Sequence, residues 1–445
     1  EFRRVLFRSS HNQPSTEFLD LCDRMGFLVI DEAFDKWKSG DNYYTRHFDE
    51  WWQKDLGNMI LRDRNHPCII LWSIGNEVGE AWREGEEYVK RAAMLQDFVH
   101  RLEPSRKVTL AAQNNHKEAF AGVTDVIGYN YLEARAISDH KKFPNRCFLI
   151  SEELPYYRGA EGNLRSYTPL NPWSLIAEND FFAGGFIWPG VDYLGEAGWP
   201  SKGWPNGLFD VCMYEKPRAA YHRAMWNKTP MVRIAVKDPF ADIDHGRDLW
   251  QWPAIVDHWN YPNKFNGLVI EVLTTTNCEE VELYRNGKLM GRERTADYTN
   301  NTIVWNIPYT PGKLEAKGFN KGKEVAYWKI ETAGKLATLK LKADRQTIKA
   351  DGQDLSHIDL TLIDDKGVKV QTDNRMITVK VSGEGRLVAL DSGDLRLNKF
   401  YTNQIKSYFG HALLTVQSTR KPGVIHAEIQ VEGIDKPFEV VIRTR

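Results

Sequence analysis

The chain has 445 residues, more than a single hydrophobic core usually organises, so we expect two or three domains. Its composition, 42% hydrophobic and 27% charged residues, is typical of globular proteins. The net charge of -1 gives no electrostatic reason to expect nucleic acid or a membrane surface as a partner. No apolar run approaches the ~18 residues that a membrane span needs.

The first nine residues, EFRRVLFRS, do not form a signal peptide, because they lack an apolar stretch of the required length. They are similar to the translation of a common sequencing adapter, so we interpret residues 1–9 as a non-native segment. A native basic start is the alternative. The five cysteines stand far apart in the sequence, which argues against a disulfide framework and against a CxxC-type metal site.

In residues 10–228, short apolar runs alternate with patterns of helical period. Asn65-His66-Pro67 and Pro104 end the two clearest helical patterns. Strands separated by helices predict right-handed βαβ units and a parallel sheet, either open or closed into a barrel. The predicted strands are residues 26–32, 68–77, 107–112, 125–131, 147–153 and 184–192, and the predicted helices are residues 47–64 and 87–103.

Two later segments, residues 229–334 and 335–445, alternate apolar and polar residues at period two and lack helical patterns. Asn286-Gly287 between two such runs is a strong signal for a two-residue hairpin. Turn residues at Asp365-Lys366-Gly367 separate strands of the last segment. Both segments therefore predict immunoglobulin-like β-sandwiches.

Acidic residues follow several predicted strands of the first segment. In parallel α/β architectures, reactive groups lie at the carboxyl ends of the strands, so these side chains are expected at one edge of the sheet. Burial of one carboxyl beside another raises one pKa and leaves the other ionised, as glycoside cleavage requires. Helix caps or solvated loop acids are the alternative for any single residue. The acids are Asp31, Glu32, Glu77, Glu152, Glu153 and Asp192.

Residues 62–77, RDRNHPCIILWSIGNE, resemble the acid/base signature of glycoside hydrolase family 2. Residues 10–12 and 19–35 are similar to the family's passage from the second to the third barrel strand, and residues 185–188, GFIW, resemble its eighth strand. The resemblance implies a partial (β/α)8 TIM barrel in residues 10–228 that lacks its first strands, followed by two immunoglobulin-like β-sandwich domains.

The resemblance implies that Glu77 is the general acid/base and that Asn76 beside it binds the sugar 2-hydroxyl. It places the nucleophile after a small residue at the end of the seventh barrel strand, which fits Glu152. Glu153 is the alternative, because only one of two neighbouring strand residues can face the barrel axis. In such a retaining site, the carboxyl groups of Glu77 and Glu152 should lie ~5–5.5 Å apart.

Four further residues are expected to contact the sugar or the nucleophile. By resemblance, Tyr131 hydrogen-bonds the nucleophile, His11 contacts the sugar or its developing charge, and Trp188 forms the floor of the sugar site. Asp35 is a candidate for binding a sugar hydroxyl. Each has an ordinary structural alternative: core packing for Tyr131 and Trp188, a hydrogen bond between strands for His11, and a solvated loop acid for Asp35.

The implied reaction is exo-acting hydrolysis of a terminal β-linked sugar with net retention, which needs no cofactor. A Glu-x-His magnesium pair found in some members is absent from residues 33–40, so we predict no catalytic metal. Residues 204–217 lack the lysine of the Asn-x-Lys motif that marks β-glucuronidases. We therefore expect a β-galactosidase, with β-mannosidase or β-glucuronidase specificity as the alternatives.

Two readings from other classes stay open: a non-catalytic carbohydrate-binding scaffold, and a protein-binding array of β-sandwiches. The substrate partner is a glycoside or an oligo- or polysaccharide, and the oligomeric state is not predicted. By resemblance, the parent protein is periplasmic or secreted, with the cytoplasm as the alternative. Since the family's first barrel strands are missing here, we expect unpaired sheet edges and an inactive or unstable fragment of an active parent.

Overall fold

The structure, a computed structural model, describes residues 6–37, 44–78, 86–112, 122–153, 172–195, 197–240, 254–396 and 401–445. It divides into two units, residues 1–188 and residues 189–445, and each is described by itself. None of the helices in the described parts has both the length and the apolar character needed to cross a membrane.

The first unit is built on one sheet of seven strands that follow one another in chain order. Every neighbouring pair is parallel, and the strands end at a common edge. Apolar and β-branched residues dominate the strands, as expected for strands covered on both faces. The strands are β1 (Leu6–Arg8), β2 (Leu28–Glu32), β3 (Ile69–Asn76), β4 (Lys107–Ala112), β5 (Val126–Asn130), β6 (Cys147–Glu153) and β7 (Phe182–Ile187).

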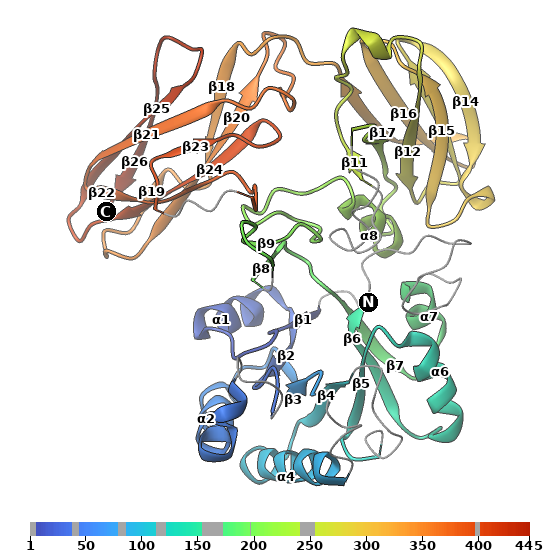
Figure 1. The fold of residues 1–445 in the computed structure, drawn as a ribbon, viewed down its shortest axis with the longest axis vertical. Helices are drawn as coiled ribbons and strands as arrows, with labels where there is room; N and C mark the ends of the chain where they lie inside the picture. The colour runs from blue at the N-terminus through green and yellow to red at the C-terminus, as the bar shows by residue number, and fades with distance from the viewer. Residues whose placement is uncertain are drawn as a thin grey trace. The chain divides into compact units, whose positions relative to one another are not determined.

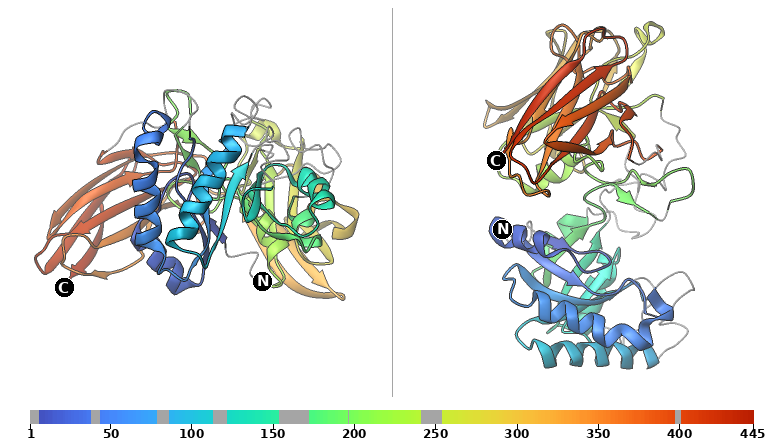
Figure 2. Two further views of the ribbon diagram at one scale, coloured as in Figure 1. Left: turned by 90° about the horizontal axis from the view of Figure 1, so that it is seen from below. Right: turned by 90° about the vertical axis from the view of Figure 1, so that its left-hand side faces the viewer.

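Helices connect these strands and cover the outer face of the sheet (Figure 1; Figure 2). The first helix has recognisable ends: the Ser15 side chain accepts a hydrogen bond from the Phe18 amide, and Gly26 adopts a left-handed φ of 76° at the other end. The helices of this unit are α1 (Thr16–Met25), α2 (Phe48–Asp63), α4 (Glu86–Leu102), α6 (Glu133–Lys142) and α7 (Pro172–Glu178).

Two hydrophobic clusters fill the first unit. The larger lies between the helices and the sheet and contains the fully buried side chains of Trp37, Trp72 and Tyr88. The smaller takes one buried residue from each of five strands, on the face of the sheet opposite the helices. Its members are Ile30, Leu71, Val126, Leu149 and Phe186.

This arrangement confirms the predicted partial barrel, which here has seven strands. The predicted strands and the two predicted helices are all present, with bounds shifted by a few residues. The two edge strands β1 and β7 contact each other, although they form no ladder, so the sheet is nearly closed rather than open as expected. Residues 6–8, which lie outside the predicted barrel, form β1 and pair with residues 28–30 of β2. Whether residues 1–9 are native stays a prediction.

The second unit begins with a short two-stranded sheet of β8 (Tyr193–Leu194) and β9 (Gly203–Trp204), followed by helix α8 (Ala219–Trp226). Four larger sheets follow, two in each of the segments predicted to be β-sandwiches. The predicted hairpin at Asn286-Gly287 joins β13 to β14, and both turn residues have positive φ, 51° and 79°, as a two-residue hairpin turn requires.

The first sandwich consists of two four-stranded sheets, ordered β11-β10-β12-β15 and β14-β13-β16-β17. Their apolar faces share one core, which includes the buried rings of Trp259 and Tyr309. The strands are β10 (Val232–Lys237), β11 (Ile255–Val256), β12 (Val269–Thr276), β13 (Glu280–Arg285), β14 (Lys288–Arg294), β15 (Thr302–Pro308), β16 (Lys313–Asn320) and β17 (Lys323–Glu331).

The second sandwich pairs a four-stranded sheet, β18-β20-β24-β22, with a five-stranded sheet, β19-β26-β25-β21-β23. Its core contains aliphatic side chains almost throughout. The strands are β18 (Thr338–Ala343), β19 (Thr347–Ile348), β20 (Leu355–Ile363), β21 (Met376–Gly383), β22 (Gly385–Asp391), β23 (Gln404–Lys406), β24 (His411–Ser418), β25 (Gly423–Val431) and β26 (Phe438–Thr444).

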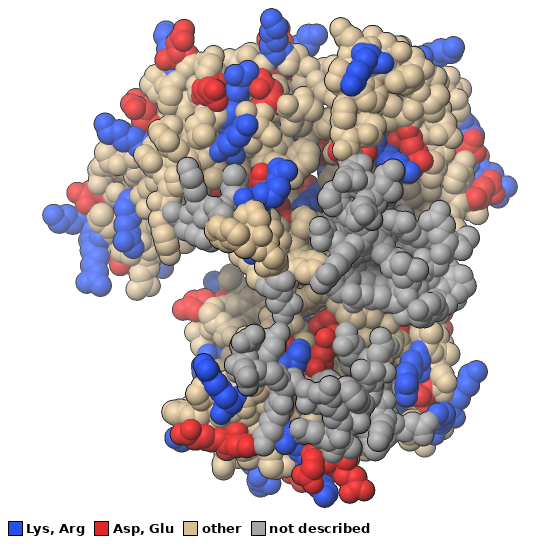
Figure 3. Space-filling view, viewed as in Figure 1, with Lys and Arg blue, Asp and Glu red and all other residues tan. Residues whose placement is uncertain are grey.

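Charged side chains of both signs are interspersed over the described surface in the view of Figure 3. This mixture agrees with the net charge of -1. Neither observation favours a polyanionic partner.

Candidate active site

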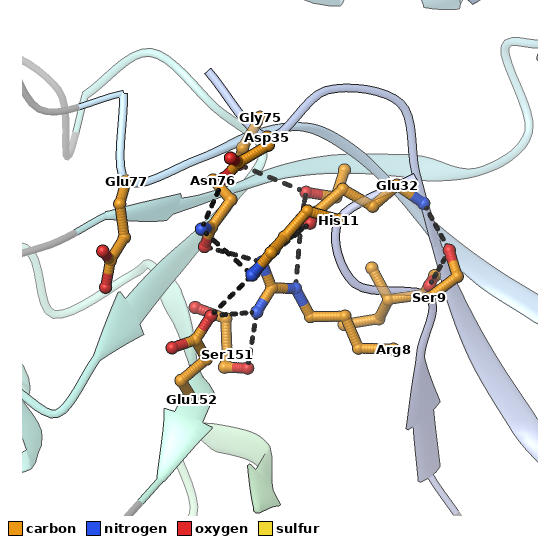
Figure 4. Close-up of polar contacts among 12 residues, drawn as sticks. Arg8, Ser9, His11, Glu32, Asp35, Gly75, Asn76, Glu77, Ser151 and Glu152 are labelled. Atoms are coloured by element: carbon orange, nitrogen blue, oxygen red, sulfur yellow. Dashed lines mark hydrogen bonds and ion pairs between the residues drawn. The ribbon is translucent and has the colours of Figure 1, made fainter. Parts of the chain in front are cut away.

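Two carboxyl groups from strands β3 and β6 face the same space at the carboxyl edge of the sheet. Glu77 directly follows β3, and Glu152 is the second-to-last residue of β6. Figure 4 shows both side chains directed into one space, with Asn76 and His11 beside them. Glu77 has a φ of 40°, an uncommon left-handed conformation for a residue with a side chain, and such strain often occurs at functional sites.

Arg8, at the end of β1, is the hub of the polar network. Its guanidinium donates to Glu152 Oε1 at 2.8 Å, to both oxygens of Glu32 at 2.8–3.0 Å, and to Asn76 Oδ1 at 2.8 Å. The Arg8 side chain is only 3% exposed, and those of Glu32 and Glu152 are 0% and 4% exposed. Arg8 therefore joins three strands through buried, charge-assisted hydrogen bonds.

Glu32, the last residue of β2, is the second centre of this network. It accepts hydrogen bonds from Arg8 and from the Ser73 hydroxyl at 2.6 Å, and its Oε1 lies 3.0 Å from His11 Nδ1. Burial disfavours the charged form, but the charge of Arg8 and the hydrogen bond from His11 outweigh it and lower the pKa of Glu32. Glu32 is therefore an ionised carboxylate that holds Arg8 and His11 in place.

Tyr131 and Arg8 bind opposite oxygens of the Glu152 carboxyl group. The Tyr131 hydroxyl donates to Oε2 at 2.6 Å, while Arg8 donates to Oε1. Tyr131 also has a left-handed φ, 59°, and its amide donates to the Glu152 carbonyl oxygen at 2.8 Å. Both side-chain contacts stabilise a carboxylate and fix its plane, as a nucleophilic carboxylate requires.

Glu77 has a different environment. Its Oε1 accepts a hydrogen bond from Asn130 Nδ2 at 3.1 Å, and the same amide group donates to Asn76 Oδ1 at 3.0 Å. Burial raises the pKa of Glu77, and the nearby charge of Glu152 raises it further, while Asn130 and the charges of Lys36 and His11 oppose the shift. A buried carboxyl with a raised pKa beside an ion-paired carboxylate is the arrangement required for general acid catalysis.

The structure separates Glu152 from its neighbour Glu153. Glu152 faces Arg8 and Tyr131, whereas the Glu153 side chain lies beside Gly185 of β7. Burial, together with the charge of Glu133, raises the pKa of Glu153 well above its ordinary value. This alternation along β6 supports Glu152 as the residue that faces the site.

The other predicted site residues lie around this pair. Asn76 Nδ2 donates to Asp35 Oδ1 at 3.2 Å, and Lys36 Nζ donates to the same oxygen at 2.7 Å. His11 stacks on Trp188, with ring centroids 5.0 Å apart and an angle of 27° between the rings. The residues expected to contact the sugar or the nucleophile therefore lie together around Glu77 and Glu152.

Other strand-end acids lie elsewhere. Asp31 faces the opposite side of β2 from Glu32, and burial together with the charge of Asp63 in α2 raises its pKa well above the ordinary value. Asp192 belongs to the second unit, where it forms an ion pair with Lys216.

No role for Arg8, Lys36 or Asn130 was expected from the sequence, and Glu32 had no expected partner. Arg8 was missed because it lies in the segment interpreted as non-native. The signal for Glu32 was visible, since it ends a strand, but its inward direction depends on the pairing of β1 with β2. The prediction that this site uses no metal or cofactor stays a prediction.

Three segments of the chain match known family descriptions. Residues 5–196 match the family description "Glycosyl hydrolases family 2, TIM barrel domain", and residues 339–437 match "Glycoside hydrolase family 2 C-terminal domain 5". Residues 267–326 match a domain of unknown function, DUF4982.

Individual relatives extend the similarity over nearly the whole chain. Beta-galactosidase BoGH2A of Bacteroides ovatus is 32% identical over 96% of the chain, and a putative beta-glucuronidase of Formosa agariphila is 29% identical over 76% of it. A crystal structure of a glycosyl hydrolase family 2 member from Bacteroides cellulosilyticus superposes with a TM-score of 0.91 at 34% identity, over 99% of this chain and 58% of that chain. The chain spans 56% of the first relative's length and 35% of the second's.

Proposed function

Because the chain belongs to glycoside hydrolase family 2, we propose that it carries the active site of a retaining β-glycosidase acting on a carbohydrate substrate. The observation that carries this proposal is the pair of carboxyl groups at the carboxyl edge of the barrel. Glu77 has a raised pKa, and Glu152 is held by Arg8 and Tyr131 in the same space (Figure 4).

In the proposed reaction, Glu152 attacks the anomeric carbon while Glu77 donates its proton to the departing glycosidic oxygen. The aglycone leaves as an alcohol, and the sugar remains as an ester of Glu152. Glu77, now ionised, takes a proton from water, and the resulting hydroxide displaces Glu152 from the anomeric carbon with net retention. The side chain of Asn76, held by Arg8 and Asn130, is placed to bind the sugar 2-hydroxyl.

The electrostatics of the two steps support these roles. Before the first step, the charge of Glu152 favours the protonated form of Glu77, as a general acid requires. Once Glu152 becomes a neutral ester, that repulsion disappears and the pKa of Glu77 falls, as a general base requires. The same two residues therefore serve both half-reactions.

We propose a β-galactoside as the substrate. This choice is supported by the relative from Bacteroides ovatus, whose name is that of a β-galactosidase and which aligns with nearly the whole chain. The putative β-glucuronidase from Formosa agariphila is similar over a smaller share of the chain. A glucuronide carries a carboxylate, and Asn206-Gly207-Leu208 has leucine in the place where the Asn-x-Lys motif of β-glucuronidases has the lysine that holds it.

A mechanism-based 2-fluoro-β-galactoside with a good leaving group tests the proposal on the 445-residue chain. The expected result is one sugar per chain, attached to Glu152 and absent from Glu152→Gln. Glu153→Gln is the matched control and should still be labelled, since Glu153 faces away from the site. Labelling of Glu153 in place of Glu152 would refute the assignment.

A second experiment isolates the role of Glu77. Glu77→Ala should lose most activity on substrates with poor leaving groups but keep more on an activated aryl glycoside, because only the former need a proton donor. Added azide should then give a β-glycosyl azide, since a small anion can enter the space left by the carboxyl group. Equal losses on both substrates would contradict an acid/base role.

A further inference from the structure

Helix α1 and the start of strand β3 bring four potential metal ligands together at the amino-terminal edge of the barrel. Asp20 and Asp23 lie three residues apart on α1 and so share a helix face. His66 and Cys68 flank Pro67 just before β3. The ligand atoms of Asp23, His66 and Cys68 all lie within 4.8 Å of one another.

The contacts within the cluster are close. Asp23 Oδ2 lies 2.7 Å from His66 Nδ1, and Asp20 Oδ1 lies 3.9 Å from the same nitrogen. Asp23 Oδ1 accepts a hydrogen bond from the Cys68 amide at 2.8 Å. One carboxylate oxygen of Asp23 is thus fixed by the backbone, which directs the other oxygen towards the imidazole.

We propose that Asp23, His66 and Cys68 form a binding site for a thiophilic divalent cation, Zn²⁺ in the first instance, with Asp20 or water as the fourth ligand. One sulfur, one imidazole nitrogen and carboxylate oxygens make a donor set that Zn²⁺ accepts in tetrahedral geometry. Hard cations such as Mg²⁺ prefer oxygen ligands alone, so the thiol and the imidazole favour zinc over magnesium.

The geometry requires only side-chain adjustments. Bond lengths of about 2.0–2.3 Å around a tetrahedral zinc ion separate its ligand atoms by roughly 3.3–3.6 Å. The contact of 2.7 Å between Asp23 and His66 must therefore open slightly, and the widest separation, at most 4.8 Å, must close. The His66 loop itself is well held, since Arg106 donates to the His66 carbonyl oxygen at 3.0 Å.

Solvent reaches the cluster from one side. The side chains of His66, Asp23 and Asp20 are 15%, 22% and 64% exposed, whereas Cys68 is buried beneath them, so an ion has an entry path. Because zinc binds the thiolate form of cysteine, ion binding must release the proton of the Cys68 thiol.

The position of the cluster indicates a structural role. Strand β3 runs for eight residues between Cys68 and Glu77, so the cluster lies more than about 20 Å from the catalytic pair. A bound ion would link α1 to the residues just before β3, since Asp23 and His66 lie 43 residues apart in the chain. We therefore expect zinc to raise the stability of the barrel without taking part in the reaction.

The test uses the untagged chain with Cd²⁺ and Zn²⁺ as probes. Cd²⁺ should produce a thiolate charge-transfer band in the near ultraviolet at one equivalent, and Zn²⁺ should raise the thermal midpoint. Cys68→Ser should remove the band and weaken Zn²⁺ binding by more than about 100-fold, beyond the loss typical of an outer-shell partner. Cys147→Ser, at an exposed cysteine, is the matched control and should behave like the parent.

Two results would overturn the proposal: no band in the parent chain, or the same band and the same midpoint shift in Cys68→Ser. If Cys68→Ser does not fold, Asp23→Asn and the exposed Asp20→Asn replace it, and the proposal requires that Asp23→Asn lose zinc affinity. All of these readouts are independent of glycoside hydrolysis, so this test stands apart from the proposed function.

Discussion

Replacing Arg8 with methionine keeps much of the apolar length of the side chain but removes the guanidinium that binds Glu32, Glu152 and Asn76. All of the charges concerned are buried, with side-chain exposures of 0–4%. The substitution therefore leaves two buried carboxylates close together without the guanidinium between them, and His11 is the remaining group within ion-pair distance of both.

Removing one partner from a buried ion pair typically costs about 3–5 kcal/mol. No discount for solvent screening applies here, because these groups are almost completely buried. For a unit of this size, each kcal/mol moves the thermal midpoint by roughly 2–4 °C, so Arg8→Met should lower it by roughly 6–20 °C. Arg8→Lys should recover only part of the loss, because an ammonium cannot match the guanidinium's fork.

Differential scanning calorimetry measures the midpoint, and the exposed Arg24 on α1 provides the control substitution Arg24→Met, which should change stability by less than about 0.5 kcal/mol. Adding Glu152→Gln to Arg8→Met should restore part of the loss, since it removes one of the stranded charges. If Arg8→Met has the same thermal midpoint as the parent chain, or if the double variant is no more stable than Arg8→Met, the ion-pair explanation is wrong.

Three further substitutions test other features of the first unit. Burial raises the pKa of Glu133 from 4.5 to about 7, so the folded chain binds this proton more tightly than the unfolded chain. The free energy of unfolding should therefore fall as the pH rises from 4.5 to about 7. Urea titrations at several pH values measure this dependence, and Glu133→Gln should make it flatter. Tyr131→Phe should lower the free energy of unfolding by about 1–3 kcal/mol, because Glu152 Oε2 loses its 2.6 Å hydrogen bond; an unchanged urea midpoint would contradict this. Gly185→Ala should cost about 1–3 kcal/mol in thermal unfolding. The reason is that its Cβ would lie within 2.5 Å of Ile176 Cδ1 and of Glu153 Oε2, and Glu153→Ala in the same background should recover part of that loss.

Much of the fold could be predicted from the sequence, because it depends on local patterns. Apolar runs ended by acids gave the strands of the barrel, and the period-two segments gave the sandwiches. The Asn286-Gly287 turn was predictable because few residue pairs accept positive φ at both positions. Helix α6 was not predicted, since its surface is largely polar and only Glu133, Ala136 and Asp139 are buried.

The candidate site was predicted in part, and what was missed depended on contacts between distant residues. Glu77 and Glu152 were identified from strand ends and from the resemblance. Arg8 was set aside with residues 1–9 as non-native, and its role depends on a buried network with acids 24 and 144 residues away. The spacing of the cysteines likewise gave no sign that Cys68 lies beside Asp23 and His66, since the approach of α1 to β3 is set by packing.

The two consecutive glutamates of β6 determine what a one-residue shift in the register of this strand would change. Glu152 and Glu153 have different surroundings, the first among polar partners and the second beside Gly185. A slip of one residue in this strand would still present a glutamate to the candidate site, although without the donors that orient it. The residue type that carries a label therefore cannot reveal such a misalignment. Mass spectrometry of the labelled peptide can reveal it, if the peptide is fragmented between residues 152 and 153.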